Sequence, residues 1–345
     1  MNLALPALTH TLVALLPVLC FLAGLVLLDS YKLIRPAAML AVLAAGVLAA
    51  AASYLVSLAA LGPLGLSLAS YSQHAAPVVE ELIKSLVIVW LARAQRIGFL
   101  VDAAILGFAV GSGFALVENL AYLHWAPQAE LSTWVVRGFG TAVMHGGATA
   151  MLAVLALSVL ERSPSAGLLA FAPGLALAAA LHWGFNQLIA WPAWAALATL
   201  VLVPALLLAV FHRSERALAD WLGSGFDADA RMLELIHSGD FAGSHAGQYL
   251  RSLQHRFSGA MMVDALCFLR LYTELAMRAK GLLMMREHGL SEPPLDAGVR
   301  AQLDELKYLE ASLGASGVRA LQPMLHMPRK ALWQIHLLQA GPHDG

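Results

Sequence analysis

The chain has 345 residues, of which 59% are hydrophobic and 12% are charged, with a mean hydropathy of +0.71 and a formal net charge of −1. This composition is too apolar for an ordinary soluble protein, and the length allows several membrane spans plus a separate domain. Neither half carries a strong net charge, so nucleic acid is not expected as a partner. The sequence therefore predicts an all-α, polytopic membrane protein that contacts the lipid bilayer.

Apolar stretches of about 20 residues, long enough to cross a bilayer as helices, recur along the first 212 residues. They lie at Thr9–Leu28, Ile34–Leu61, Ser72–Ala92, Phe99–Leu123, Leu131–Leu160, Ala166–Ala190 and Trp191–Phe211. Charged residues are concentrated after His212. We therefore expect a seven-helix transmembrane domain over residues 1–212 and an α-helical domain over residues 213–345.

Basic residues occupy alternate connections between these spans, namely Lys32 and Arg35, Arg93 and Arg96, Arg162, and Arg213 and Arg216. Because short cytoplasmic loops are enriched in Lys and Arg, this pattern places the N-terminus outside and the C-terminal domain in the cytoplasm. The C-terminal domain reads as amphipathic helices, with a long one near Met261–Glu287. It contains no catalytic motif that would indicate its role or its partner.

The segment Pro77–Trp90 places Glu80, Glu81 and Lys84 within an otherwise apolar helix. Each ionisable group at mid-bilayer costs about 2.5–3.5 kcal/mol on insertion scales, so three of them require a strong compensating reason. Two interpretations remain open. The charges form an internal ion pair that holds helices together, or one acid faces a reaction site while the lysine holds the other.

Other spans bring polar residues to a similar depth in the outer half of the membrane. They are Glu118 and Asn119, the stripe Arg137, Thr141, His145 and Thr149 at intervals of four, and His182 and Asn186, also four apart. This convergence favours a functional site. Gly107 and Gly111 form a small-xxx-small pair, which predicts close helix packing beside it.

Carboxylates beside histidines in a water-poor site suit the activation of a water molecule. In one version a glutamate takes the proton of the water, and His182 and Asn186 donate hydrogen bonds to the developing oxyanion. In the other, His145 and His182 bind a divalent metal such as Zn²⁺, with Glu118 as the third ligand, or Glu80 or Glu81 in its place. The residue types alone leave both versions open.

These residues resemble the motif set of the PrsW family of intramembrane proteases. The matching segments are Glu80-Glu81-x-x-Lys84, Phe114-x-x-x-Glu118-Asn119, His145 after Arg137, and His182-x-x-x-Asn186, within roughly Ser72–Gln187. Related CAAX-processing and bacteriocin-processing peptidases have motifs similar to EExxxR, FxxxH and HxxxN. Here lysine stands one position before their arginine, and Glu118-Asn119 stands where they have histidine.

The resemblance implies cleavage of membrane-anchored proteins, such as an anti-sigma factor in a bacterial stress response, by an enzyme of the inner membrane. It also implies catalytic roles for Glu80, Glu81, Lys84, Glu118, Asn119, His145, His182 and Asn186, with Glu80 as the water-activating group. Three alternatives are an ion-coupled transporter, a seven-span sensor without catalysis, and a rhomboid-like serine site at Ser112.

Overall fold

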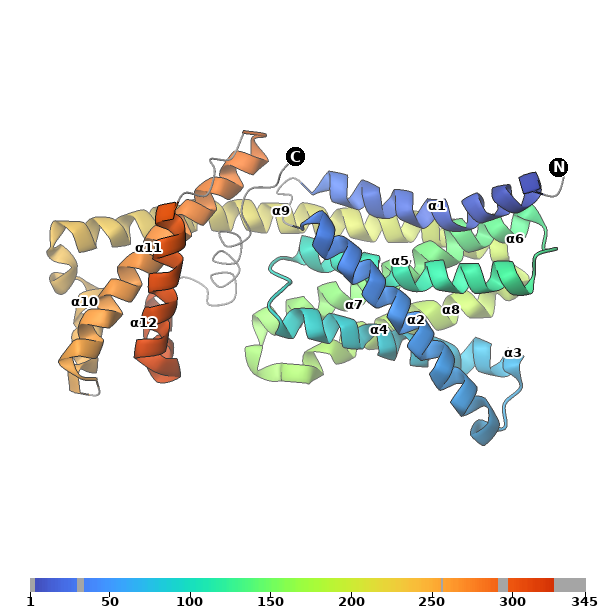
Figure 1. Ribbon diagram of the computed structural model, residues 1–345, viewed down its shortest axis with the longest axis horizontal. Coiled ribbons are helices and arrows are strands. Elements are labelled where there is room, and N and C mark those ends of the chain that lie inside the picture. The colour runs from blue at the N-terminus through green and yellow to red at the C-terminus, as the bar shows by residue number, and fades with distance from the viewer. Residues whose placement is uncertain (1–3, 30–33, 256, 291–296, 326–345) are drawn as a thin grey trace. The chain divides into compact units, whose positions relative to one another are not determined.

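The computed structural model describes residues 4–29, 34–255, 257–290 and 297–325, and within these ranges every regular element is a helix. The all-α prediction is therefore confirmed (Figure 1). The contacts separate two compact units, Met1–Glu215 and Arg216–Gly345. Helix α9, Pro192–Ser238, contains the boundary between them.

Six helical runs among the described residues are long and apolar enough to cross a membrane. They are Ala7–Leu28 in α1 (Ala4–Leu28), Pro36–Pro63 in α2 (Pro36–Leu64), α5 (Leu100–Trp125), Leu131–Arg162, Ser165–Gln187, and α9. The run Leu131–Arg162 consists of α6 (Leu131–Val135), the π-helix η2 (Val136–Thr141) and α7 (Ala142–Arg162). The run Ser165–Gln187 lies in the 3-10 helix η3 (Pro164–Phe171) and α8 (Ala172–Gln187).

The remaining predicted span, Ser72–Ala92, is also helical. It follows the short α3 (Leu68–Ser70) and consists of the π-helix η1 (Tyr71–Ala75) and α4 (Ala76–Arg93). Helix α4 contains the charged residues Glu80, Glu81, Lys84 and Arg93, more than a candidate span has in its apolar window. The predicted membrane bundle is therefore confirmed with six candidate spans rather than seven.

The two π-helices interrupt stretches that the sequence pattern predicts as regular α-helix. A π-helical turn contains an extra residue, is rare, and frequently occurs at functional sites. In η2 the departure falls on Gly138 and Gly140, which pack against α1 and α9: a Cβ on Gly138 would lie 2.0 Å from the carbonyl oxygen of Val13. Both π-helices contribute residues to the cavity described below.

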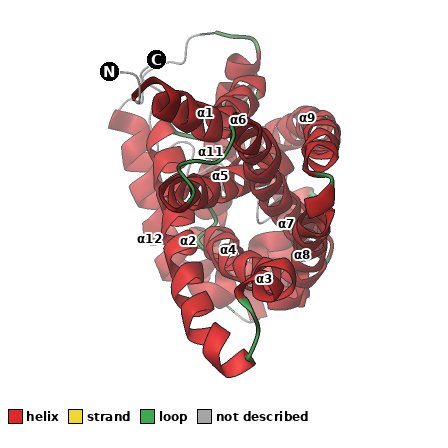
Figure 2. Ribbon diagram, turned by 90° about the vertical axis from the view of Figure 1, so that its right-hand side faces the viewer, coloured by secondary structure: helices red, strands yellow, loops and turns green. Residues whose placement is uncertain are grey.

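Helices α5 and α7 form the buried centre of the first unit, and α1 and α2 also pack against α5 (Figure 2). Their close approach depends on glycine. A Cβ on Gly111 would lie 2.2 Å from the carbonyl oxygen of His145, and one on Gly107 would lie 2.8 Å from that of Thr149. The predicted small-residue packing is confirmed, and it brings the α5 carboxylate Glu118 within reach of His145.

The second unit contains the end of α9 and a set of further helices. These are η5 (Asp240–Gly243), α10 (His245–Ser252), η6 (Leu253–His255), α11 (Gly259–Glu287), α12 (Ala297–Leu321) and η7 (Gln322–Met324). Helix α11 confirms the long helix predicted at Met261–Glu287. The ammonium of the buried Lys280 in α11 lies 2.6 Å from the carboxylate of Asp229 in α9, which ties these two helices together.

Candidate active site

Glu81 and Lys84 form a fully buried ion pair, with Lys84 Nζ 2.5 Å from Glu81 Oε1. They lie three residues apart on α4, so both side chains lie near one face of that helix. Each then contacts an imidazole from another helix. Lys84 Nζ lies 3.1 Å from His145 Nδ1 on α7, and Glu81 Oε1 lies 3.0 Å from His182 Nδ1 on α8. The ion pair therefore positions two histidines rather than merely neutralising itself.

The contact with Lys84 decides which nitrogen of His145 carries the proton. An ammonium group can only donate, so Nδ1 of His145 accepts and Nε2 carries the hydrogen. That Nε2–H donates to Glu118 Oε2 at 2.8 Å. A neutral imidazole that binds a metal through one nitrogen carries its hydrogen on the other. A metal ion at this Nε2 would therefore require the proton to move to Nδ1, and Lys84 would no longer donate to that atom.

Arg137 of η2 holds Glu118 in place from the other side. Its Nη2 lies 3.1 Å from Glu118 Oε1, and its Nε donates to Asn119 Oδ1 at 2.9 Å. The guanidinium also lies over the ring of Tyr122, 3.6 Å from its centroid, a cation–π arrangement. Asn119 in turn donates to the carbonyl oxygen of Ala14 at 2.7 Å. Glu118 thus joins Arg137 to His145.

Glu80 lies beside the two histidines with an unsatisfied oxygen. Its Oε2 is buried, has no hydrogen-bond partner, and lies 3.9 Å from His182 Nε2. Glu80, His145 and His182 each offer one ligand atom within 4.8 Å of the others. A buried carboxylate oxygen without a partner is costly, so its presence between imidazoles favours a bound cation or a bound water.

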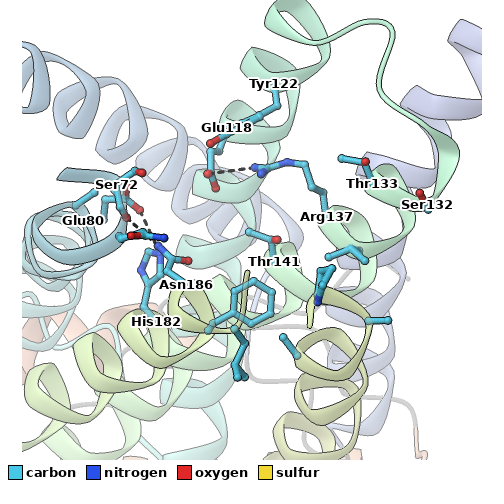
Figure 3. A pocket seen from close by; sticks show the side chains of 18 residues that line it. Ser72, Glu80, Glu118, Tyr122, Ser132, Thr133, Arg137, Thr141, His182 and Asn186 are labelled. Atoms are coloured by element: carbon cyan, nitrogen blue, oxygen red, sulfur yellow. Dashed lines mark hydrogen bonds and ion pairs between the residues drawn. The ribbon is translucent and has the colours of Figure 1, made fainter. Parts of the chain in front are cut away.

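A cavity of about 590 Å³ opens beside these groups. Its walls come from η1, α4, α5, α6, η2, α8, the 3-10 helix η4 (Leu188–Ala190) and α9, and the side chains of Glu80 and His182 reach it. Figure 3 shows Glu118, Tyr122 and Arg137 across the cavity from Ser72, Glu80 and Asn186. The cavity therefore gives a reacting molecule access to the carboxylates while the ion pair stays buried.

The sequence-predicted residues fall into two sets in the structure. Six of them, Glu80, Glu81, Lys84, Glu118, His145 and His182, belong to one contact network. Asn119 reaches this network through Arg137 and does not line the cavity. Asn186 lines the cavity, where its Nδ2 donates to the carbonyl oxygen of Ser72 at 3.0 Å. The hydroxyl of Ser112 donates to Phe108 O within its own helix, so nothing places it in this site.

Residues 31–211 match the PrsW family intramembrane metalloproteases. The match spans just over half of the sequence, from the connection before α2 to the last part of α9 that was predicted to lie in the membrane. The chain belongs to the PrsW family. It is accordingly a membrane peptidase of the metalloprotease type. No curated protein and no solved structure matches the chain.

The donor set of this PrsW-family chain fits a metal ion. Two imidazoles and a carboxylate are the ligands of many catalytic zinc sites, in which the fourth position stays open for water. The Nδ1 atom of His182 faces a carboxylate, the outer contact that usually orients a metal-binding histidine. The group found here contains Glu80, whereas Glu118, first choice as third ligand from the sequence, contacts both His145 Nε2 and Arg137.

The sequence placed Arg137 in the polar stripe with His145 but predicted no catalytic role for it, and it did not predict Tyr122 as part of the site of this PrsW-family chain. The interval of four that links Arg137 with His145 was a signal for the first. Tyr122 lies four residues after Glu118 and so on the same face of α5, a position equally typical of a tyrosine anchored at the membrane surface. Its contribution becomes visible only when η2 places the guanidinium over its ring.

Proposed function

We propose that the chain is an endopeptidase that hydrolyses a peptide bond of a membrane-anchored protein within the cavity. The observation that carries this proposal is the group formed by Glu80, His145 and His182 at the cavity wall, with one carboxylate oxygen that has no partner. Its residues come from three helices, so only the folded bundle assembles it.

Glu80, His145 and His182 are the residues that would hold the metal. When bound, a divalent ion supplies Lewis-acid chemistry, since it lowers the pKa of a coordinated water and polarises a carbonyl. The carboxylate of Glu81 fixes the orientation of His182 through Nδ1. The ammonium of Lys84 balances the charge of that carboxylate, and both side chains are fully buried.

When Glu80 serves as a metal ligand, Glu118 Oε2 is the general base that accepts the proton of the attacking water. Arg137 binds the other oxygen, so Oε2 keeps its direction toward His145 and the cavity. In the metal-free version, Glu80 itself takes this proton through its unpartnered oxygen. In both versions a carboxylate at the cavity wall acts as the general base.

Asn186 is the residue that stabilises the developing oxyanion of the substrate by a hydrogen bond. A side-chain amide has two N–H donors, and the carbonyl oxygen of Ser72 takes only one of them. The other remains for an oxygen in the cavity, the kind of contact that stabilises a tetrahedral intermediate. This assignment follows the order His182-x-x-x-Asn186, which puts both side chains on one face of α8.

The membrane arrangement that we assign includes α4 as a seventh span, with residues 1–212 as the membrane domain and residues 213–345 as a cytoplasmic domain. The alternation of basic connections supports an outer N-terminus. With that topology the cavity lies toward the outer face of a bacterial inner membrane. The substrate class is then a membrane-anchored protein cut near its outer end, such as an anti-sigma factor.

Purified protein is expected to cleave a single-span reporter in detergent, and mass spectrometry of the products should place the cut near the outer end of the reporter span. Glycine or proline there should favour cleavage, because a carbonyl inside an intact helix is hydrogen-bonded and shielded. A reporter with alanine and leucine at those positions is the matched control. A cut on the cytoplasmic side would contradict the proposed topology and the place of the site.

Purified wild-type protein is expected to contain about one zinc ion per chain, and His145→Ala is expected to lose it, because two ligands rarely retain the ion. Elemental analysis gives the metal content. The matched control is His124→Ala, since His124 is an exposed residue of α5 outside the group. Full activity of wild-type protein that has been stripped of metal would establish the metal-free version.

A further inference from the structure

Two side-chain amides close the seam between α8 and η1 at the wall of the cavity. Asn186 Nδ2 donates to the carbonyl oxygen of Ser72 at 3.0 Å, and Gln187 Nε2 donates to that of Gln73 at 3.1 Å. Consecutive residues of α8 thus bind consecutive carbonyls of η1. Asn186, Ser72 and Gln73 also line the cavity, whereas Gln187 is exposed. The amide pair therefore lies between the cavity and the exterior of the bundle.

Three other helix contacts near the cavity depend on close backbone packing instead. A Cβ on Gly138 would clash with the backbone of α1, one on Gly140 would lie 2.7 Å from Ala196 Cβ of α9, and one on Gly111 would clash with α7. Separating these helices would break close backbone packing. Gly184 of α8, close to the seam, has no atom within 4 Å of its Cβ position. The η1–α8 seam therefore depends on polar contacts that a competing backbone can replace.

The structure of η1 also suits movement. It is a π-helix, a rare conformation in a stretch between two α-helices, and it lies between Gly65, a helix cap with φ 60°, and Pro77 at the start of α4. A hydrogen bond of 3.0 Å from the Tyr71 hydroxyl to Ser57 Oγ ties η1 to α2. The N-terminal end of η1 is thus held to α2 by Tyr71, and the chain turns at Gly65 just before it.

We propose that the η1–α8 seam is the lateral entrance through which the membrane span of the substrate reaches the cavity. This inference rests on the proposed function. On opening, Asn186 loses the carbonyl oxygen of Ser72 as a partner and offers its amide to a carbonyl of an unwound substrate segment, whereas Gln187, which does not line the cavity, only closes the seam. The partner is an apolar helix whose end is weakened by glycine, proline or polar residues, because only an unwound segment has carbonyls free to accept.

Helix α8 and helix α4, which continues from η1, expose apolar side chains at the spacing of one helix face. They are Val78, Leu82 and Leu86 on α4 and Leu177 and Leu181 on α8. An apolar span can therefore rest against either helix while its weakened end enters the cavity.

A reversible cross-link across the seam tests the entrance. In a background with both cysteines replaced, Cys20→Ala and Cys267→Ala, the pair Gln73→Cys and Gln187→Cys is joined by a short bifunctional methanethiosulfonate reagent. The cross-linked protein is expected to lose cleavage of the single-span reporter, and reduction is expected to restore it. Each single-cysteine protein treated with the same reagent is the control, and it should keep cleaving.

Equal cleavage by the cross-linked and the reduced protein would overturn the entrance. Absence of cleavage by the cysteine-free parent would overturn the proposed function instead, so the two failures are distinguishable. A second variant, Gln187→Ala, removes one of the two closing hydrogen bonds. If opening limits the reaction, cleavage should accelerate by roughly two- to tenfold, the equilibrium shift expected for one such bond. An unchanged or slower rate would count against the seam as the entrance.

Discussion

Glu80→Gln is expected to abolish cleavage of the single-span reporter, with a loss of roughly 10²- to 10⁴-fold, the range that a general base or an equivalent ionised group contributes. The amide keeps the shape of the carboxylate but can neither take a proton from water nor supply negative charge to a cation. Because Oε2 of Glu80 has no hydrogen-bond partner in the structure, the substitution breaks no hydrogen bond of that atom. Rates measured at equal protein concentration give the effect.

The matched control for this variant is Glu130→Gln. Glu130 is the N-cap residue of α6, and its carboxylate contacts only Ser132, at 3.3 Å, among the described hydrogen bonds. Its neutralisation should leave cleavage unchanged. Both variants should reach the membrane in wild-type amounts, as measured by membrane fractionation. Wild-type cleavage by Glu80→Gln would remove Glu80 from the reaction, both as base and as metal ligand.

The site residues could be found in the sequence because ionisable groups are rare inside membrane helices. A buried charge in lipid needs a partner, so Glu80, Glu81 and Lys84 are enough to single out the segment that forms α4. Intervals of four then selected His145 and His182, since such residues share a helix face. The helix period and the cost of charge in lipid thus predicted most members of the contact network. They did not predict which atom contacts which.

The pairing within the network could not be predicted, because it depends on how helices pack rather than on spacing. The position of Glu118 in the sequence is compatible with two roles, that of a metal ligand and that of a general base. Only the contact of α5 with α7 at Gly111, together with the departure of η2 from α-helical geometry, turns Glu118 toward Arg137 and His145. Neither a π-helix nor a tautomer has a distinct residue pattern.

The structure also changes the choice between the two interpretations of the α4 charges. A pair that only held helices together would join two helices, but Glu81 and Lys84 belong to the same one. The connection to α7 and α8 runs through His145 and His182, which are the residues of the candidate metal group. Support of the fold and support of the site therefore depend on the same contacts, and a stability measurement can separate them.

Lys84→Met is expected to destabilise the protein by about 3–5 kcal/mol, the usual cost of leaving one partner of a buried ion pair without the other. Lys84 and Glu81 are both fully buried, so water cannot replace the lost ammonium. Methionine has nearly the same length and can still pack against Phe114, whose ring centre lies 4.7 Å from the ammonium. Unfolding in detergent, followed by circular dichroism, measures the loss.

The double variant Glu81→Gln with Lys84→Met is the matched control, since it removes both charges and keeps the volume. Its stability should return close to that of wild type, because replacing a whole buried pair by neutral groups is often nearly neutral. Its cleavage activity should stay lost, since a neutral amide in place of the Glu81 carboxylate no longer supports His182 as the carboxylate does. Recovery of stability without recovery of cleavage would show that the pair serves the site. Recovery of both would reduce it to a structural contact within α4.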